Sequence, residues 1–164
     1  MRKLFSILAV VFMLFLVGCN SEKTESKTEV DPKEIESRIS EALKQMGEKT
    51  NLKIISSEEN EDGQHVIALS ENIHVFIKDN KITLAAMPDT LFAEKEDLNF
   101  AFVLLVGIAD DSLSYGERNK VVSELGLTDS KNNLMDYTKV NNHNNVQYTY
   151  KGDKESILLQ AEIK

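Results

Sequence analysis

Apolar and polar positions divide the chain into three parts. Residues 4–17 form an almost unbroken apolar segment, and residues 20–30 are almost entirely polar. From residue 31 onward, apolar residues recur every 3.6 positions in some segments and every second position in others, which are the periods of amphipathic helices and half-buried strands. The pattern predicts one folded domain over 31–164, preceded by two segments of other kinds.

A helix is predicted directly after Asp31. Asp31 is a favoured N-cap residue, Pro32 suits the first helical position, and Glu34 completes a capping box. Gly47 is placed to end the helix. Between these ends lies one apolar stripe, made of Ile35, Ile39, Ala42, Leu43 and Met46. The stripe favours a helix packed on the core over a helix that binds a partner.

Four strands are predicted next. Their apolar positions alternate at about 52–57, 65–69, 73–77 and 81–86. The acidic stretch 58–63 reads as a turn-rich loop, Asp79-Asn80 as a tight hairpin turn, and Pro88 as the end of the last strand. These segments predict a four-stranded antiparallel meander.

Two helices and further strands complete the predicted domain. Residues 98–109 are apolar all round, which predicts a buried helix, and about 12 residues are too few to cross a bilayer. A second helix is predicted from the Ser114 to Glu117 capping box to the Gly126-Leu127 end. Strands are then expected near 135–140, from Val146 and at 156–163, with residues 141–145 forming a turn. The order predicts an α+β fold, an antiparallel sheet with helices packed on one face.

The apolar N-terminal segment has the features of a secretory signal. Arg2 and Lys3 precede it, and residues 4–17 fall short of the roughly 20 apolar residues that a membrane-spanning helix needs. It closes with Leu16-Val17-Gly18-Cys19, which resembles the lipobox of bacterial lipoproteins at all four positions. The resemblance implies a signal peptide over 1–18, cleavage between Gly18 and Cys19, and a diacylglycerol on the Cys19 thiol. Two acyl chains on one residue give a stable membrane anchor.

This resemblance also implies a location. Residues 19–30 would form a lipidated N-terminus and a tether, which the Ser, Thr, Glu and Lys content predicts to be disordered. The protein would sit on the outer, extracytoplasmic face of the cell membrane, in the manner of Gram-positive surface lipoproteins. The alternatives are an ordinary secretory signal with a chance cysteine and an uncleaved anchor.

Net charge and cysteine content argue against several classes of partner and of reactive site. The 164 residues carry a formal net charge of -8, which becomes -10 after removal of 1–18 because Arg2 and Lys3 are lost. Such a charge argues against nucleic acid as a partner and against membrane attachment through a basic face. Cys19 is the only cysteine. Its acylation would leave no thiol for a disulfide, a metal site or a nucleophile.

No motif compels a catalytic chemistry. His65, His74 and His143 are scattered along the chain without metal-ligand spacing, and the acidic loop lacks the ligand spacing of a calcium-binding EF-hand. No nucleophile-elbow, phosphate-binding or dinucleotide-binding motif occurs. We therefore expect no metal and no cofactor.

Four residues are weak candidates for a binding site. Asp110 and Asp111 could do acid–base work if burial separated their pKa values, but adjacent carboxylates at a helix end are more simply loop and capping residues. Tyr148 and Tyr150 could form an aromatic platform on an exposed sheet face, and core packing is the simpler interpretation.

Three classes of function are compatible with these observations. The first, which we predict, is a membrane-anchored binding or protein-interaction module whose partner is an envelope or surface protein. The second is a structural lipoprotein that assembles an envelope complex. The third is an enzyme whose active-site residues are dispersed along the chain. The sequence does not indicate an oligomeric state.

Overall fold

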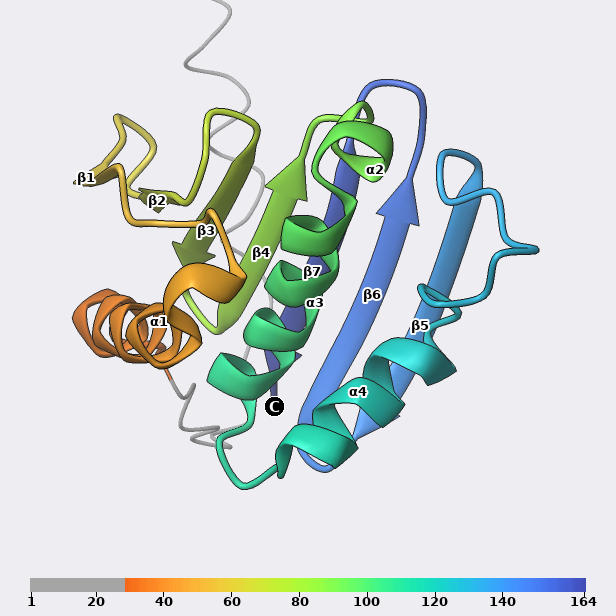
Figure 1. Ribbon diagram of the computed structural model, residues 1–164. Helices are drawn as coiled ribbons and strands as arrows, with labels where there is room; N and C mark the ends of the chain where they lie inside the picture. Colours follow the sequence, from red (N-terminus) through yellow and green to blue (C-terminus); the bar gives the residue numbers. More distant parts are fainter. Residues whose placement is uncertain (1–28) are drawn as a thin grey trace, which may run out of the picture.

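The computed structural model describes residues 29–164. The predicted signal peptide, Cys19 and most of the predicted tether therefore lie outside the described residues. The fold is α+β, as predicted, with one seven-stranded antiparallel sheet and helices packed against it (Figure 1). The strands are β1 Ser56–Glu59, β2 His65–Ala68, β3 Ile73–Lys78, β4 Lys81–Ala86, β5 Tyr137–His143, β6 Val146–Gly152 and β7 Ile157–Ile163. The helices are α1 Pro32–Met46, α2 Thr90–Ala93, α3 Lys95–Ala109 and α4 Tyr115–Glu124, and a 3-10 turn over Gly47–Lys49 follows α1.

The sheet joins an N-terminal half to a C-terminal half. Its strand order is β1-β2-β3-β4-β7-β6-β5, so the predicted four-stranded meander is confirmed and the last strand of the chain returns to the middle. β7 pairs with β4 from Lys81 opposite Glu162 to Ala86 opposite Ile157. β1 and β5 are left as the two edges of the sheet.

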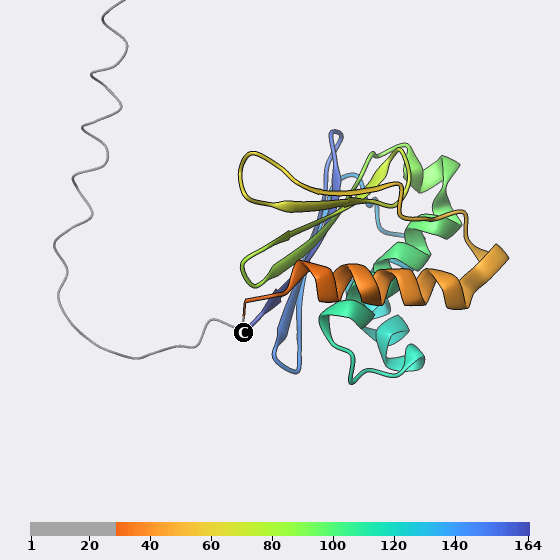
Figure 2. The same cartoon turned by 90° about the vertical axis from the view of Figure 1, so that its left-hand side faces the viewer.

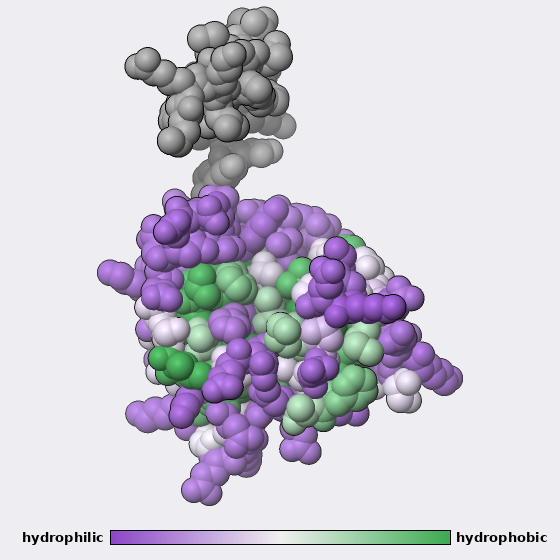
Figure 3. Space-filling model, turned by 90° about the horizontal axis from the view of Figure 1, so that it is seen from above, coloured by the Kyte–Doolittle hydropathy of each residue, from purple (hydrophilic) through white to green (hydrophobic). Residues whose placement is uncertain are grey.

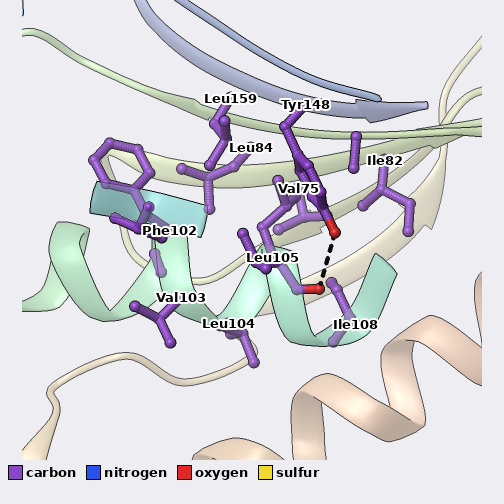
Figure 4. Packing of buried hydrophobic residues seen from close by; sticks show 14 of the residues in the cluster. Val75, Ile82, Leu84, Phe102, Val103, Leu104, Leu105, Ile108, Tyr148 and Leu159 are labelled. Carbon is purple, nitrogen blue, oxygen red and sulfur yellow. Dashed lines mark hydrogen bonds between the residues drawn. The ribbon is translucent and has the colours of Figure 1, made fainter. Parts of the chain in front are cut away.

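The helices cover one face of this sheet. α3 lies over its middle, with α1 and α4 on either side, and in the view turned by 90° the helices are all on one side of the strands (Figure 2). Alternate residues of the central strands point toward α3, among them Leu84, Leu159 and Tyr148 (Figure 4). They meet Phe102 and Leu105 of α3, which have almost no exposed surface. Burial of these side chains is the main source of stability in the fold.

α3 is the buried helix that the sequence predicts. Ten of its 15 residues are buried, which is why it shows no polar face. It begins at Lys95, three residues earlier than the apolar run, because charged residues form its first turn. No helix among the described residues is both long and apolar enough to cross a membrane.

The helix ends are largely as predicted. Asp31 caps α1 by accepting a hydrogen bond from the Lys33 backbone N–H at 2.9 Å. The predicted capping box is wrong at Glu34, because this side chain binds Arg38 at 2.6 Å one turn along the helix. Val30 differs from the tether to which we assigned it. It is buried and donates its backbone N–H to the Asp79 carbonyl at 2.9 Å.

Two strand predictions are corrected. The first strand is Ser56–Glu59 rather than 52–57, because Glu58 and Glu59, which we placed in the acidic loop, pair with β2. The fifth strand runs to His143, so only Asn144 and Asn145 form the turn that we placed over 141–145. Asn144 has φ +51°, a conformation that asparagine tolerates and that a two-residue hairpin turn requires.

Candidate functional site

A cavity of about 450 Å³ opens at one end of the domain, and we call it the end cavity. It lies between α2, the first turns of α3 and the loop that leads from α4 to β5. Its residues are Leu91, Phe92, Lys95, Leu98, Asn99, Leu127, Thr128, Asp129, Ser130, Asn132, Asn133, Leu134 and Met135. Seen from this end of the molecule, hydrophobic residues gather in patches between hydrophilic ones (Figure 3).

The interior of the end cavity is aliphatic. Leu98 and Leu127 are buried, and the partly exposed Leu91, Leu134 and Met135 complete this apolar surface. Phe92 lies beside it with 75% of its surface exposed. An exposed phenylalanine next to an aliphatic cavity offers apolar surface that a ligand or partner can cover.

The rim of the end cavity is mostly uncharged. Five of its residues carry amides or hydroxyls, and Lys95 and Asp129 contribute one charge of each sign. Several rim groups make no hydrogen bond with any described residue, including the Asn99 amide, the Asn132 Oδ1 and the Asn133 Nδ2. These free donors and acceptors suit a ligand that combines an apolar part with uncharged polar groups.

The loop at the end cavity is fixed by specific contacts. Gly126, at φ +75°, ends α4 and donates its N–H to the Ser123 carbonyl at 2.8 Å, while Leu127 donates to Val122 at 3.2 Å. This is the Schellman end that the sequence predicts. The Asn132 amide then donates back to the Gly126 carbonyl at 2.9 Å. The cavity wall is thus ordered rather than a free loop.

A second set of contacts ties the same loop to the sheet. The Tyr150 hydroxyl donates to the Leu134 carbonyl at 2.9 Å. The same carbonyl sits against Gly152, where a Cβ atom would collide with it. Tyr150 and Gly152 of β6 therefore position the loop that supplies most of the residues of the end cavity.

The two tyrosines that we considered as a binding platform lie in the core. Neither Tyr148 nor Tyr150 has exposed surface, and the Tyr148 hydroxyl donates to the Val106 carbonyl at 3.5 Å (Figure 4). Burial raises the pKa of both phenols well above the usual range, so both stay neutral. Phe102 packs edge-on against Tyr150 at 6.0 Å between ring centres.

Asp110 and Asp111 lie at the opposite end of the domain and have separate partners. Asp110 is buried and accepts hydrogen bonds from the Ser112 hydroxyl and the Asn144 amide, both at 2.6 Å. Burial alone would raise the pKa of Asp110, but these hydrogen bonds outweigh it and lower the pKa below its usual range. Asp111 is exposed and binds Arg38 at 2.9 Å. The two carboxylates thus make separate structural contacts, and Asp110 remains an anion.

The three histidines are not brought together. His65 lies 2.9 Å from the Ser57 hydroxyl, His74 lies beside Phe76 on the sheet face without helices, and His143 is on β5 rather than in the predicted turn. Within residues 29–164, no group of three or more potential ligands could hold a metal ion.

Sequence reasoning missed the end cavity. Its residues come from α2, which is only four residues long, and from a loop, and neither has a periodicity that could reveal it. The available signal was Phe92, an aromatic residue in the short segment between the charged residues Asp89 and Glu94. Comparison with known proteins adds no homologue, since no family model, no curated protein and no solved structure matches this chain.

Proposed function

We propose that this protein is a lipid-anchored lipoprotein on the outer face of the cell membrane, and that its domain is a binding module whose site is the end cavity. The lipobox at residues 16–19 supports the anchor. The net charge of -10 that remains after signal removal supports a partner other than nucleic acid. An envelope or surface protein is the partner that this location offers.

One observation carries the proposal of a binding module. Phe92 is 75% exposed beside a 450 Å³ cavity that has an aliphatic interior and unused amide groups on its rim. An exposed aromatic ring next to a pocket suits an interface anchor, since aromatic residues, phenylalanine included, are enriched in the cores of protein interfaces. The cavity volume also falls within the range of small-ligand sites.

The position of the end cavity supports the same proposal. The described chain enters the domain at Val30, which is bonded to Asp79 in the turn between β3 and β4. α2, whose residues Leu91 and Phe92 line the end cavity, lies at the opposite end of these strands (Figure 1). The point at which the described chain enters the domain is therefore remote from the end cavity.

The proposal is tested by photo-cross-linking in intact cells. A benzoylphenylalanine placed at Phe92 of the full-length protein should form an adduct on irradiation. The matched control is the same residue at Tyr115, an aromatic position that is 64% exposed on α4, away from the cavity. We expect the adduct at position 92 and not at position 115, and mass spectrometry then identifies the partner.

A third variant separates the cavity from the exposed ring. Leu98→Gln, combined with the cross-linker at position 92, places an amide in the aliphatic interior and should reduce the adduct about tenfold or more. Circular dichroism of this variant verifies that the fold is retained. Adducts of equal yield at positions 92 and 115, or a yield that Leu98→Gln leaves unchanged in a folded protein, would contradict the proposed site.

A further inference from the structure

The two edges of the sheet differ in length and charge. β1 has only four residues, two of which are Glu58 and Glu59, and the acidic turn follows it. β5 has seven residues and no carboxylate, and none occurs in β6 either. Short strands and charged side chains are the devices by which proteins prevent unwanted pairing at a sheet edge. β1 has both devices, whereas β5 has only Lys139.

The free edge of β5 is available for pairing. All seven of its residues are in register with β6, from Tyr137 opposite Gly152 to His143 opposite Val146. Of the backbone hydrogen bonds that turns and loops make within residues 29–164, none ends on β5. Val140, the middle residue, is 48% exposed. Alternate N–H and C=O groups along this strand therefore point outward without a partner strand.

We propose that two copies of this chain pair through β5, antiparallel, with Val140 of one copy opposite Val140 of the other. Because β5 runs from 137 to 143, this register pairs the whole strand with itself. The opposed residues are Val140 with Val140, Lys139 with Asn141, Thr138 with Asn142, and Tyr137 with His143. The exposed Val140 side chains of the two copies face each other, no two lysines are opposed, and the paired strands carry no carboxylate.

The pairing gives a closed dimer. The contact is isologous, since the same strand is used by both copies, and a two-fold axis perpendicular to the sheet relates them. The two sheets would become continuous, with all helices on one side. Association stops at two copies because the remaining edges are the short acidic β1 strands. The dimer does not depend on the end cavity.

Disulfide cross-linking tests the register. Cys19 is the only natural cysteine, so Val140→Cys adds one site to the full-length, membrane-bound protein. With a mild oxidant, we expect a covalent dimer on a non-reducing gel. Thr138→Cys is the matched control on the same exposed face of β5. Its two copies would be offset by four residues, about 13 Å along the strand, too far for a disulfide. We expect roughly tenfold less dimer from it than from Val140→Cys, and none from the wild type.

A second measurement is independent of oxidation. In sedimentation of the detergent-solubilised protein, the wild type should be a dimer, and Val140→Lys should be a monomer because two ammonium groups would face each other. Equal cross-linking of Val140→Cys and Thr138→Cys would overturn the proposal. A monomeric wild type, or a Val140→Lys variant that remains a dimer, would do the same.

Discussion

At the scale of single residues, Asp97 connects the segment that follows α1 to the first turn of α3. It is 7% exposed and accepts three hydrogen bonds, from the Thr50 hydroxyl at 2.7 Å, the Asn51 backbone at 3.0 Å and the Asn51 amide at 3.0 Å. Burial favours the neutral acid, but the hydrogen bonds outweigh burial and lower the pKa of Asp97 below its usual range. The carboxylate thus fixes the segment after α1 to the first turn of α3.

Replacing this carboxylate should destabilise the protein. Asp97→Asn turns one acceptor oxygen into an NH₂ group that faces the donor amide of Asn51, and we expect a loss of about 2 kcal/mol in the free energy of unfolding. Urea unfolding at neutral pH measures this loss. Asp89→Asn is the control, because Asp89 is exposed and its side chain caps no helix. An equal effect of the two substitutions would show that the network around Asp97 contributes nothing.

The pH dependence of the free energy of unfolding tests the direction of the Asp97 pKa shift. Because the pKa of Asp97 is lower in the folded state than in the unfolded state, its contribution is complete above the unfolded value of about 3.9 and is lost as the pH falls below that value. The difference in stability between wild type and Asp97→Asn should therefore shrink in acid. Repeating the unfolding curves between neutral pH and pH 3 tests this. A difference that grew in acid would mean that the pKa of Asp97 is raised by folding.

At the scale of elements, the sequence predicts those helices and strands whose pattern of burial is regular along their whole length. α3 is apolar on all sides because it is buried on all sides, and β4, β6 and β7 alternate because one of their faces packs on helices. The strand predicted near 135–140 differs from β5, which runs from Tyr137 to His143. Because β5 packs little against the core, Thr138, Lys139 and Asn142 show no apolar alternation. The end cavity was not predictable, since it depends on how α2 and the loop over 127–135 meet. Nor was the pairing of β4 with β7, which are about 75 residues apart in the chain.

A glycine of β6 tests how the sheet supports the end cavity. Gly152→Ala would drive a Cβ atom into the Leu134 carbonyl, and we expect a loss of about 1–3 kcal/mol in the free energy of unfolding together with a displaced cavity loop. Gly116→Ala is the control, since nothing lies within 4 Å of its Cβ position in α4, and it should stabilise the protein by about 0.5–1 kcal/mol. Urea unfolding checks both values, and cross-linking at position 92 should weaken in Gly152→Ala alone. Equal stability of the two variants would contradict the contact with Leu134.

At the scale of the whole molecule, the net charge of the domain does not account for the membrane location that we propose. Residues 29–164 hold the acidic part of the protein, and their charge repels anionic lipid rather than attracting it. The membrane attachment that we propose would then come from elsewhere in the chain. Cys19, at the end of the sequence that resembles a lipobox and outside the described residues, is the group that we expect to supply it.

The anchor can be tested by changing one atom. Cys19→Ser replaces the sulfur that would carry the diacylglycerol with oxygen, and it should abolish incorporation of a labelled lipid precursor and release the protein from washed membranes. The wild type should keep the label and resist washing with 1 M salt, because two acyl chains hold it and salt screens only charge. Asn20→Ser is a matched control that leaves the thiol in place. Equal labelling of Cys19→Ser and wild type, or release of the wild type by salt alone, would show that the protein is held by something other than a lipid on Cys19.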